Sequence, residues 1–151
     1  MSELIVCEQL QKRYGKNVIL ANVSFEINEP KIVGLIGRNG VGKSTLLKML
    51  AGHLNASSGK VEVVGKKAFQ NLTVAANTIL IEDAMTFPSV LTLKEILQNA
   101  PKFYPNFALD LAFELLKFSG ISDKNHHHQL SKGQKAAFDL LYGIASRSAV
   151  T

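Results

Sequence analysis

The stretch Gly37-Arg38-Asn39-Gly40-Val41-Gly42-Lys43-Ser44 decides the fold, because it matches the pattern G-x-x-x-x-G-K-[ST]. It follows the apolar run 32–36, which reads as a strand buried on both faces, and it precedes a helical pattern over 43–50. Glycines let such a loop curl so that its backbone N–H groups point at phosphate oxygens, and the helix dipole adds to that field. The stretch predicts a phosphate site; a glycine-rich turn without a ligand is the alternative.

Two side chains of this loop are predicted to act on a bound nucleotide. Lys43 would reach the β- and γ-phosphates, and the Ser44 hydroxyl would ligate Mg²⁺. The loop alone leaves GTPases, kinases and ATPases open. GTPases also need an N-K-x-D stretch that reads the base, and the sequence lacks one.

Length and composition suit one ordinary domain or part of a larger one. The chain has 151 residues, of which 46% are hydrophobic and 19% charged, and this excludes intrinsic disorder. The net charge of +5 suits an anionic ligand, although ordinary solubility explains it equally well. Cys7 is the single cysteine and has no partner for a disulfide. The segment that starts at Met1 lacks the basic residues with which a secretory signal begins. No apolar run is long enough to span a membrane. We expect a cytoplasmic protein.

The rest of the chain reads as strands followed by helices. Four strands are expected, at Leu4–Gln9, Val18–Ile27, Val61–Val64 and Thr78–Ile81, with turns near Gly15 and over 55–59. In the helical part, one apolar stripe is predicted to face inward and Gly120 to end that helix. The stripe consists of Phe107, Leu111, Leu115 and Phe118. A last helix over 131–146 is predicted to turn Ala136, Ala137, Leu140, Leu141, Ile144 and Ala145 inward.

The histidine run His126-His127-His128 is predicted to be a solvated loop. Adjacent side chains on an extended segment point to opposite sides, so three consecutive histidines form a poor chelate for a metal ion. We therefore predict no metal site there.

The phosphate loop in its fuller form, which ends at Thr45, resembles that of the ATP-binding-cassette (ABC) ATPases. Tyr14, within Lys12-Arg13-Tyr14-Gly15-Lys16, resembles the aromatic loop of that family, in which a ring stacks on adenine. Taken alone, Tyr14 would be read as a turn residue. The resemblance implies ATP with Mg²⁺ as cofactors, bound by Tyr14 and by Gly37, Arg38, Asn39, Gly40, Val41, Gly42, Lys43, Ser44 and Thr45.

A second stretch, Leu130-Ser131-Lys132-Gly133-Gln134, resembles the family signature L-S-G-G-Q, with Lys132 at the third position. In the family, this helix start faces the γ-phosphate held by the opposite subunit. Ser131 and Gln134 also form the pattern of a capping box, and the two interpretations are compatible.

A third stretch, 79–83 followed by Phe87, resembles the strand and loop that carry the family's catalytic glutamine. Glu82 stands at the glutamine position, where the family's residue contacts Mg²⁺ and the attacking water. A carboxylate can bind Mg²⁺ but, when ionised, cannot donate a hydrogen bond. In a different phosphate-loop family, the same strand would be a Walker B strand in which Asp83 holds Mg²⁺.

The resemblance implies an α/β fold of the P-loop NTPase class, an ABC-type nucleotide-binding domain with an N-terminal antiparallel β part, a parallel core and a helical subdomain. The expected parts of 1–151 are a core over 1–83, a helical subdomain over about 84–130 and a signature helix over 131–147. In the family an apolar strand ending Asp-Glu follows that helix, and the sequence stops at Thr151 before it. We therefore expect a domain that is incomplete at the C-terminus and, by itself, inactive in hydrolysis.

The function implied by the resemblance is that of the ATPase subunit of an ABC transporter, with export favoured by forms such as L-S-K-G. The implied partners are a second ATPase subunit in a head-to-tail dimer and a transmembrane permease subunit at the inner face of the membrane. The permease would dock on part of the aromatic-rich block 84–119, which also reads as a small helical core. No nucleic acid is expected. The alternatives are a non-hydrolysing regulatory module and a soluble ABC-type protein that works on nucleic acid or ribosomes.

Overall fold

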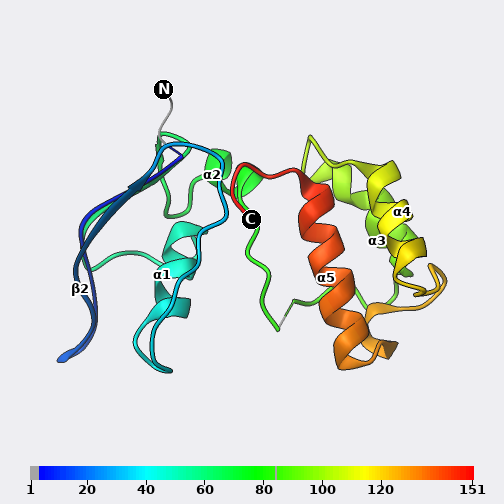
Figure 1. The fold of residues 1–151 in the computed structure, drawn as a ribbon, viewed down its shortest axis with the longest axis horizontal. Helices are drawn as coiled ribbons and strands as arrows, with labels where there is room; N and C mark the ends of the chain where they lie inside the picture. Colours follow the sequence, from blue (N-terminus) through cyan, green and yellow to red (C-terminus); the bar gives the residue numbers. More distant parts are fainter. Residues whose placement is uncertain (1–3, 84) are drawn as a thin grey trace. The chain divides into compact units, whose positions relative to one another are not determined.

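The computed structural model describes residues 4–83 and 85–151. Met1 to Glu3, where the lack of a secretory signal was predicted, and Ala84, where the helical subdomain was expected to begin, lie outside the described residues. The chain forms two compact units, one up to Thr78 together with Val150, the other over Ile79–Ala149 together with Thr151 (Figure 1).

The first unit is built on an antiparallel hairpin, as predicted. Strands β1 (Ile5–Tyr14) and β2 (Asn17–Ile27) meet at the pair Tyr14 and Asn17. Gly15 has φ +57°, a left-handed conformation that glycine adopts without steric cost. Strand β1 runs five residues further than the expected Gln9, which itself has φ +47° and sits at an irregularity in the register.

Two more antiparallel strands complete the sheet in the order β2-β1-β3-β4. Strand β3 (Ser58–Val63) pairs with β1, and β4 (Lys66–Lys67) pairs with β3. The expected strand at Val61–Val64 therefore begins earlier and ends at Val63. Helix α1 (Lys43–Leu50) was predicted correctly, and its buried residues Leu46 and Met49 belong to one apolar cluster with residues of the sheet.

Two predicted strands are wrong in detail. The run 32–36 is not a strand but an exposed segment, with Ile32 and Ile36 almost fully accessible. Of the strand expected over 78–81, only Thr78 takes part in a ladder, through a single parallel bridge to Val150. A buried parallel strand needs neighbours on both sides, and the described residues supply none for 32–36. A short helix that was not predicted, α2 (Leu72–Asn77), precedes Thr78.

The second unit is helical. It contains α3 (Leu93–Asn99), the 3₁₀ turn η1 (Ala100–Lys102), α4 (Leu109–Phe118), the 3₁₀ turn η2 (His127–Gln129) and α5 (Lys132–Ser146). Helix α3 begins with a capping box between Thr92 and Glu95, and burial of Leu93, Ile96 and Leu97 fixes its inner face. Gly120, at φ +71°, follows the end of α4 as predicted.

The predicted inner faces of α4 and α5 are rotated from the observed ones. In α4 the buried residues are Ala112 and Leu116, whereas Phe118 is 92% exposed. In α5, Leu141 and Ala145 are buried as predicted, but Leu140 and Ile144 are about half exposed. Phe138 and Tyr142, which were not predicted to face inward, are buried, and burial of these two large rings sets the inner face of α5.

Candidate functional site

The glycine-rich loop meets helix α1 at Gly42, which caps the helix with φ +104°. No side chain caps this helix start, and no acidic residue lies in its first turn. The Gly42 carbonyl accepts the first helical hydrogen bond, from Leu46 N at 2.9 Å. The helix therefore begins with backbone N–H groups and a positive dipole end that favour an anion.

Gly42 is also required by close packing. A Cβ at this position would lie 2.9 Å from Cδ2 of Leu20 and 3.1 Å from the carbonyl oxygen of Ile19. Together with its positive φ, this crowding means that a larger residue would push the loop away from strand β2. The glycine therefore holds the loop close to the hairpin.

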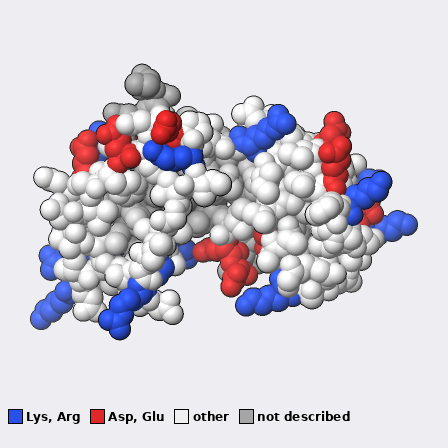
Figure 2. Space-filling model, in the orientation of Figure 1, with Lys and Arg blue, Asp and Glu red and all other residues white. Residues whose placement is uncertain are grey.

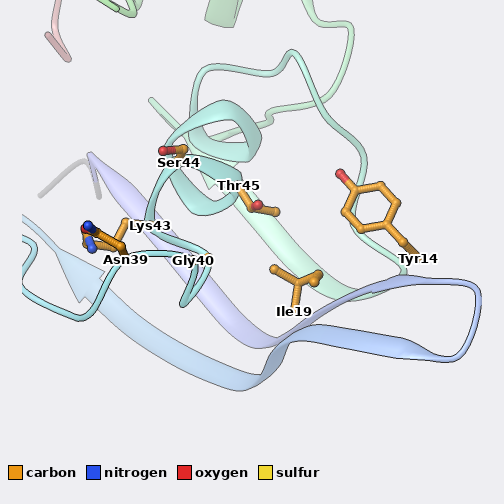
Figure 3. A pocket seen from close by; sticks show the side chains of 8 residues that line it. Tyr14, Ile19, Asn39, Gly40, Lys43, Ser44 and Thr45 are labelled. Carbon is orange, nitrogen blue, oxygen red and sulfur yellow. The ribbon is translucent and has the colours of Figure 1, made fainter.

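A cavity of about 330 Å³ opens between the loop, the first turn of α1 and the end of the hairpin (Figure 3). Most of the predicted phosphate-loop residues and Tyr14 line it. The lining residues are Tyr14, Ile19, Asn39, Gly40, Gly42, Lys43, Ser44 and Thr45. Gly37, Arg38 and Val41 belong to the same loop without lining the cavity, and Val41 N donates to the Arg38 carbonyl at 3.3 Å.

Lys43 folds back over its own loop. Its Nζ donates to the carbonyl oxygens of Gly37, at 2.6 Å, and Arg38, at 2.9 Å. The ammonium group is thus held at the mouth of the loop by neutral acceptors and not by a carboxylate. Because phosphate oxygens are charged acceptors, they compete well for these donors.

Tyr14 lies at the tip of the hairpin and is 52% exposed, while the Lys12 ammonium stands 5.0 Å from the centre of its ring. Ile19 also lines the cavity but was not predicted. The β1–β2 register shifts between Lys12 and Arg13, which pair with Leu20 and Val18, so Ile19 is the extra residue of a bulge. Alternation in the sequence gives no signal for such a bulge.

The signature-like stretch lies in the second unit and forms the start of α5. Ser131 Oγ accepts from Gln134 N at 3.3 Å, and Gln134 Oε1 accepts from Ser131 N at 3.0 Å, so the predicted capping box is present. Leu130 is buried, whereas residues 131–134 are exposed. A Cβ at Gly133 would meet no atom within 4 Å, so packing against the described residues does not require a glycine there.

Glu82 also lies in the second unit, in an exposed segment. The backbone carbonyl of Glu82 accepts a hydrogen bond from Met85 N at 3.0 Å. Its neighbour Asp83 is 4.0 Å from the Lys132 ammonium, with both side chains more than nine-tenths exposed. An ion pair so exposed contributes little to stability. The structure thus brings Tyr14 and the phosphate loop together in one unit, and 82–83 and the signature-like stretch together in the other.

The prediction of a solvated loop at 126–128 is wrong for its central residue. His127 is 6% exposed, and its Nε2 lies 2.8 Å from Oδ1 of the buried Asp139. Burial raises the pKa of the Asp139 carboxyl, and the hydrogen bond with His127 opposes that rise. An apolar pattern cannot reveal this pair, because both residues read as surface residues.

The family model described as "ABC transporter" matches residues 20–151. The chain belongs to the ABC transporter family. It is 31% identical to the ABC transporter ATP-binding protein YtrB of Bacillus subtilis (strain 168), over 97% of this chain and 50% of that protein. It is 30% identical to the methionine import ATP-binding protein MetN of Clostridium tetani (strain Massachusetts / E88), over 87% of this chain and 45% of that protein. The chain thus spans about half the length of these relatives.

The fold is that of ABC ATP-binding subunits. A solved structure described as the ATP-binding subunit of an ABC transporter superimposes with a TM-score of 0.83 at 21% identity, covering 98% of this chain and 68% of that chain. The structure of cbiO1 from Clostridium perfringens, described as part of the complex cbiONQ, gives a TM-score of 0.72 at 21% identity, over 98% and 63%. The predicted fold class, an ABC-type domain of the P-loop class, is therefore confirmed, although of the expected parallel core the described residues form only the bridge between Thr78 and Val150. Over 4–83 and 85–151, no helix is long and apolar enough to cross a bilayer.

Proposed function

We propose that this chain supplies the MgATP-binding part of an ABC transporter ATPase subunit. The observation that supports this most is the cavity, which is lined by a hairpin tyrosine, by an uncapped helix start and by the loop lysine. Tyr14 would stack on adenine, the N–H groups over 37–45 and Lys43 would bind the phosphates, and Ser44 would ligate Mg²⁺. The division into a core over 1–83, a helical part and a signature helix over 131–147 belongs to the same proposal.

Hydrolysis would require a second subunit, arranged head-to-tail. The exposed start of α5, with Ser131, Gly133 and Gln134, would face the γ-phosphate held by the opposite subunit, and the free space around Gly133 is what close approach of a ligand needs. Lys132 would add positive charge beside that phosphate. Leu130, buried under the turn, would hold the stretch in place.

Glu82 would occupy the glutamine position and bind Mg²⁺ directly or through water. The sequence contains no Asp-Glu pair after α5, so a polypeptide of residues 1–151 would bind ATP without activating water for attack. Hydrolysis is proposed for the full-length protein alone.

The proposed partner in the membrane is a permease subunit, which would place the chain at the inner face of the membrane. On the face shown in Figure 2, Lys and Arg side chains stand in several separate groups, and Asp and Glu side chains lie beside some of them. The proposal of a permease partner rests on membership of the ABC transporter family. The export direction, predicted from Lys132, stays a prediction; of the two relatives, MetN is named for import.

Equilibrium binding of ATP in the presence of Mg²⁺ tests the proposal. Lys43→Ala removes charge-assisted hydrogen bonds to phosphate, so we expect the affinity to fall by about tenfold to a hundredfold. Lys66→Ala removes the same charge from an exposed position on β4 and should change the affinity less than about twofold. Equal losses in the two variants, or no binding by the wild type, would refute the proposal.

A further inference from the structure

Lys12 and Tyr14 lie two residues apart on strand β1, so their side chains leave the same face of the sheet. The Lys12 Nζ stands 5.0 Å from the centre of the Tyr14 ring. This distance falls within the range of a cation–π interaction, in which the negative ring face attracts the ammonium. One face of the ring is thus occupied by a cation.

The Lys12 ammonium is fixed by a second contact. Its Nζ donates to the backbone carbonyl of Asn55 at 2.7 Å. The turn that presents this carbonyl is itself tied to β1, because Ser57 N donates to the Gln11 carbonyl at 2.9 Å and Arg13 N donates to Ser57 Oγ at 3.0 Å. The lysine therefore connects the turn at Asn55 to the tyrosine ring.

Tyr14 lines the cavity and Lys12 does not, so a base in the cavity would meet the ring without meeting the ammonium. Tyr14 lines the cavity together with Ile19 and Thr45, and about half of its surface is exposed (Figure 3). A freely rotating tyrosine would lose rotamer freedom when a base stacks on it. A ring already held by a cation loses less rotamer freedom on stacking. The cation also draws π-electron density away from the free face of the ring, which favours stacking with an electron-rich purine.

We propose that Lys12 is a positioning residue for the nucleotide base: fixed by Asn55, it holds Tyr14 in a stacking orientation and polarises its ring. This inference rests on the proposed ATP function, and it makes Lys12 act through Tyr14 and not through the phosphates. A lysine that only added positive charge to the site would act on any polyphosphate.

A double-mutant cycle separates these possibilities. Lys12→Met should weaken ATP binding by about threefold to tenfold. In the Tyr14→Leu background, the same change should have an effect below about twofold, because the ring on which Lys12 acts is gone. Lys12→Arg should retain wild-type affinity, since a guanidinium also binds an aromatic face.

Inorganic tripolyphosphate is the second probe, because it has phosphates but no base. Lys12→Met should leave its affinity unchanged within about twofold, and the control Lys16→Met, which removes a charge from the exposed hairpin turn, should leave both ligands unchanged within the same limit. Thermal unfolding of each variant checks that the fold is retained.

Equal losses for ATP and tripolyphosphate, or equal losses with and without the Tyr14 ring, would overturn the inference. So would an unchanged ATP affinity in a folded Lys12→Met variant. Failure of the wild type to bind ATP would instead refute the proposed function.

Discussion

His127 and Asp139 form a buried pair, with His127 Nε2 2.8 Å from Asp139 Oδ1. His127 belongs to the turn η2, just before the signature-like stretch, and Asp139 lies in the second turn of α5. The rings of Phe87 and His127 pack in a T-shaped arrangement, with the ring centres 4.9 Å apart. The pair therefore ties the chain that enters α5 to the helix itself.

Replacing Asp139 should reveal the hydrogen bond and the charge separately. Asp139→Ala leaves His127 Nε2 buried without a partner, so the free energy of unfolding should fall by about 1–3 kcal/mol. Asp139→Asn keeps an acceptor oxygen, so in this variant the free energy of unfolding should fall by less. Denaturant unfolding at pH 7 measures both; an alanine variant as stable as the asparagine variant would contradict a role for the hydrogen bond.

The same pair predicts a pH dependence. Burial is the main cause that raises the pKa of Asp139, with the hydrogen bond from His127 opposing it. A raised pKa means that the native state binds the proton of Asp139 more tightly than the unfolded state does. The stabilisation that this proton gives is fully present below the unfolded-state pKa of about 3.9, and it is lost as pH rises through the folded-state pKa. The stability of Asp139→Asn relative to the wild type should therefore increase between about pH 3.5 and pH 7. A constant difference over this range would refute the predicted direction of the shift.

Two glycines of α5 should respond in opposite ways to alanine. A Cβ at Gly143 would collide with the Ile81 side chain, whereas at Gly133 it would meet nothing within 4 Å. Gly143→Ala should lower the free energy of unfolding, because overpacking costs about 1–3 kcal/mol and the higher helix propensity of alanine returns about 1 kcal/mol at most. Gly133→Ala should be neutral or stabilise the helix by up to about 1 kcal/mol.

The Gly133→Ala variant also separates the stability of the fold from its proposed function. In the full-length protein, Gly133→Ala should impair ATP-dependent dimerisation, measured by sedimentation, in spite of its unchanged stability. A Gly133→Ala protein that dimerises normally with ATP would count against the proposed contact in trans.

The dependence of ATP binding on Mg²⁺ tests whether Asp83 holds the ion, as a Walker B residue would, or is only an exposed neighbour of Glu82. Ser44→Ala should remove most of the enhancement of ATP binding by Mg²⁺, because the hydroxyl is a proposed ligand. Asp83→Asn should leave this enhancement within about twofold of the wild type, since Asp83 is exposed beside Lys132. Loss of the Mg²⁺ effect in Asp83→Asn would instead support a Walker B role for this strand.

The rate of ATP hydrolysis should differ between a polypeptide of residues 1–151 and the full-length protein. A polypeptide of residues 1–151 should bind ATP but release phosphate no faster than its Lys43→Ala variant, because residues 147–151 contain no carboxylate side chain to activate water. Phosphate release under saturating MgATP measures this. A clear excess over the Lys43→Ala background would show that another residue, with Glu82 the first candidate, takes that role.

Most of the candidate site could be predicted from local sequence. The loop over 37–45, the hairpin tyrosine and the capping box at Ser131 each depend on residues close together in the chain, and local sequence specifies them. The expected strands at 32–36 and 78–81 failed because a parallel strand depends on neighbours distant in sequence. Ile19 depends on a bulge, and the His127–Asp139 pair on tertiary packing, so neither leaves a periodic signal.

The exposed segment 32–36 lies between strand β2 and the phosphate loop. Its residues lead directly into Gly37, and Ile32 and Ile36 are almost fully accessible. A sheet partner that pairs with this segment would restrict the entry to the loop, so the loop would lose less freedom when phosphates bind. If such a partner pairs with 32–36, the ATP affinity of the loop would be linked to that pairing, and each would strengthen the other by the same factor.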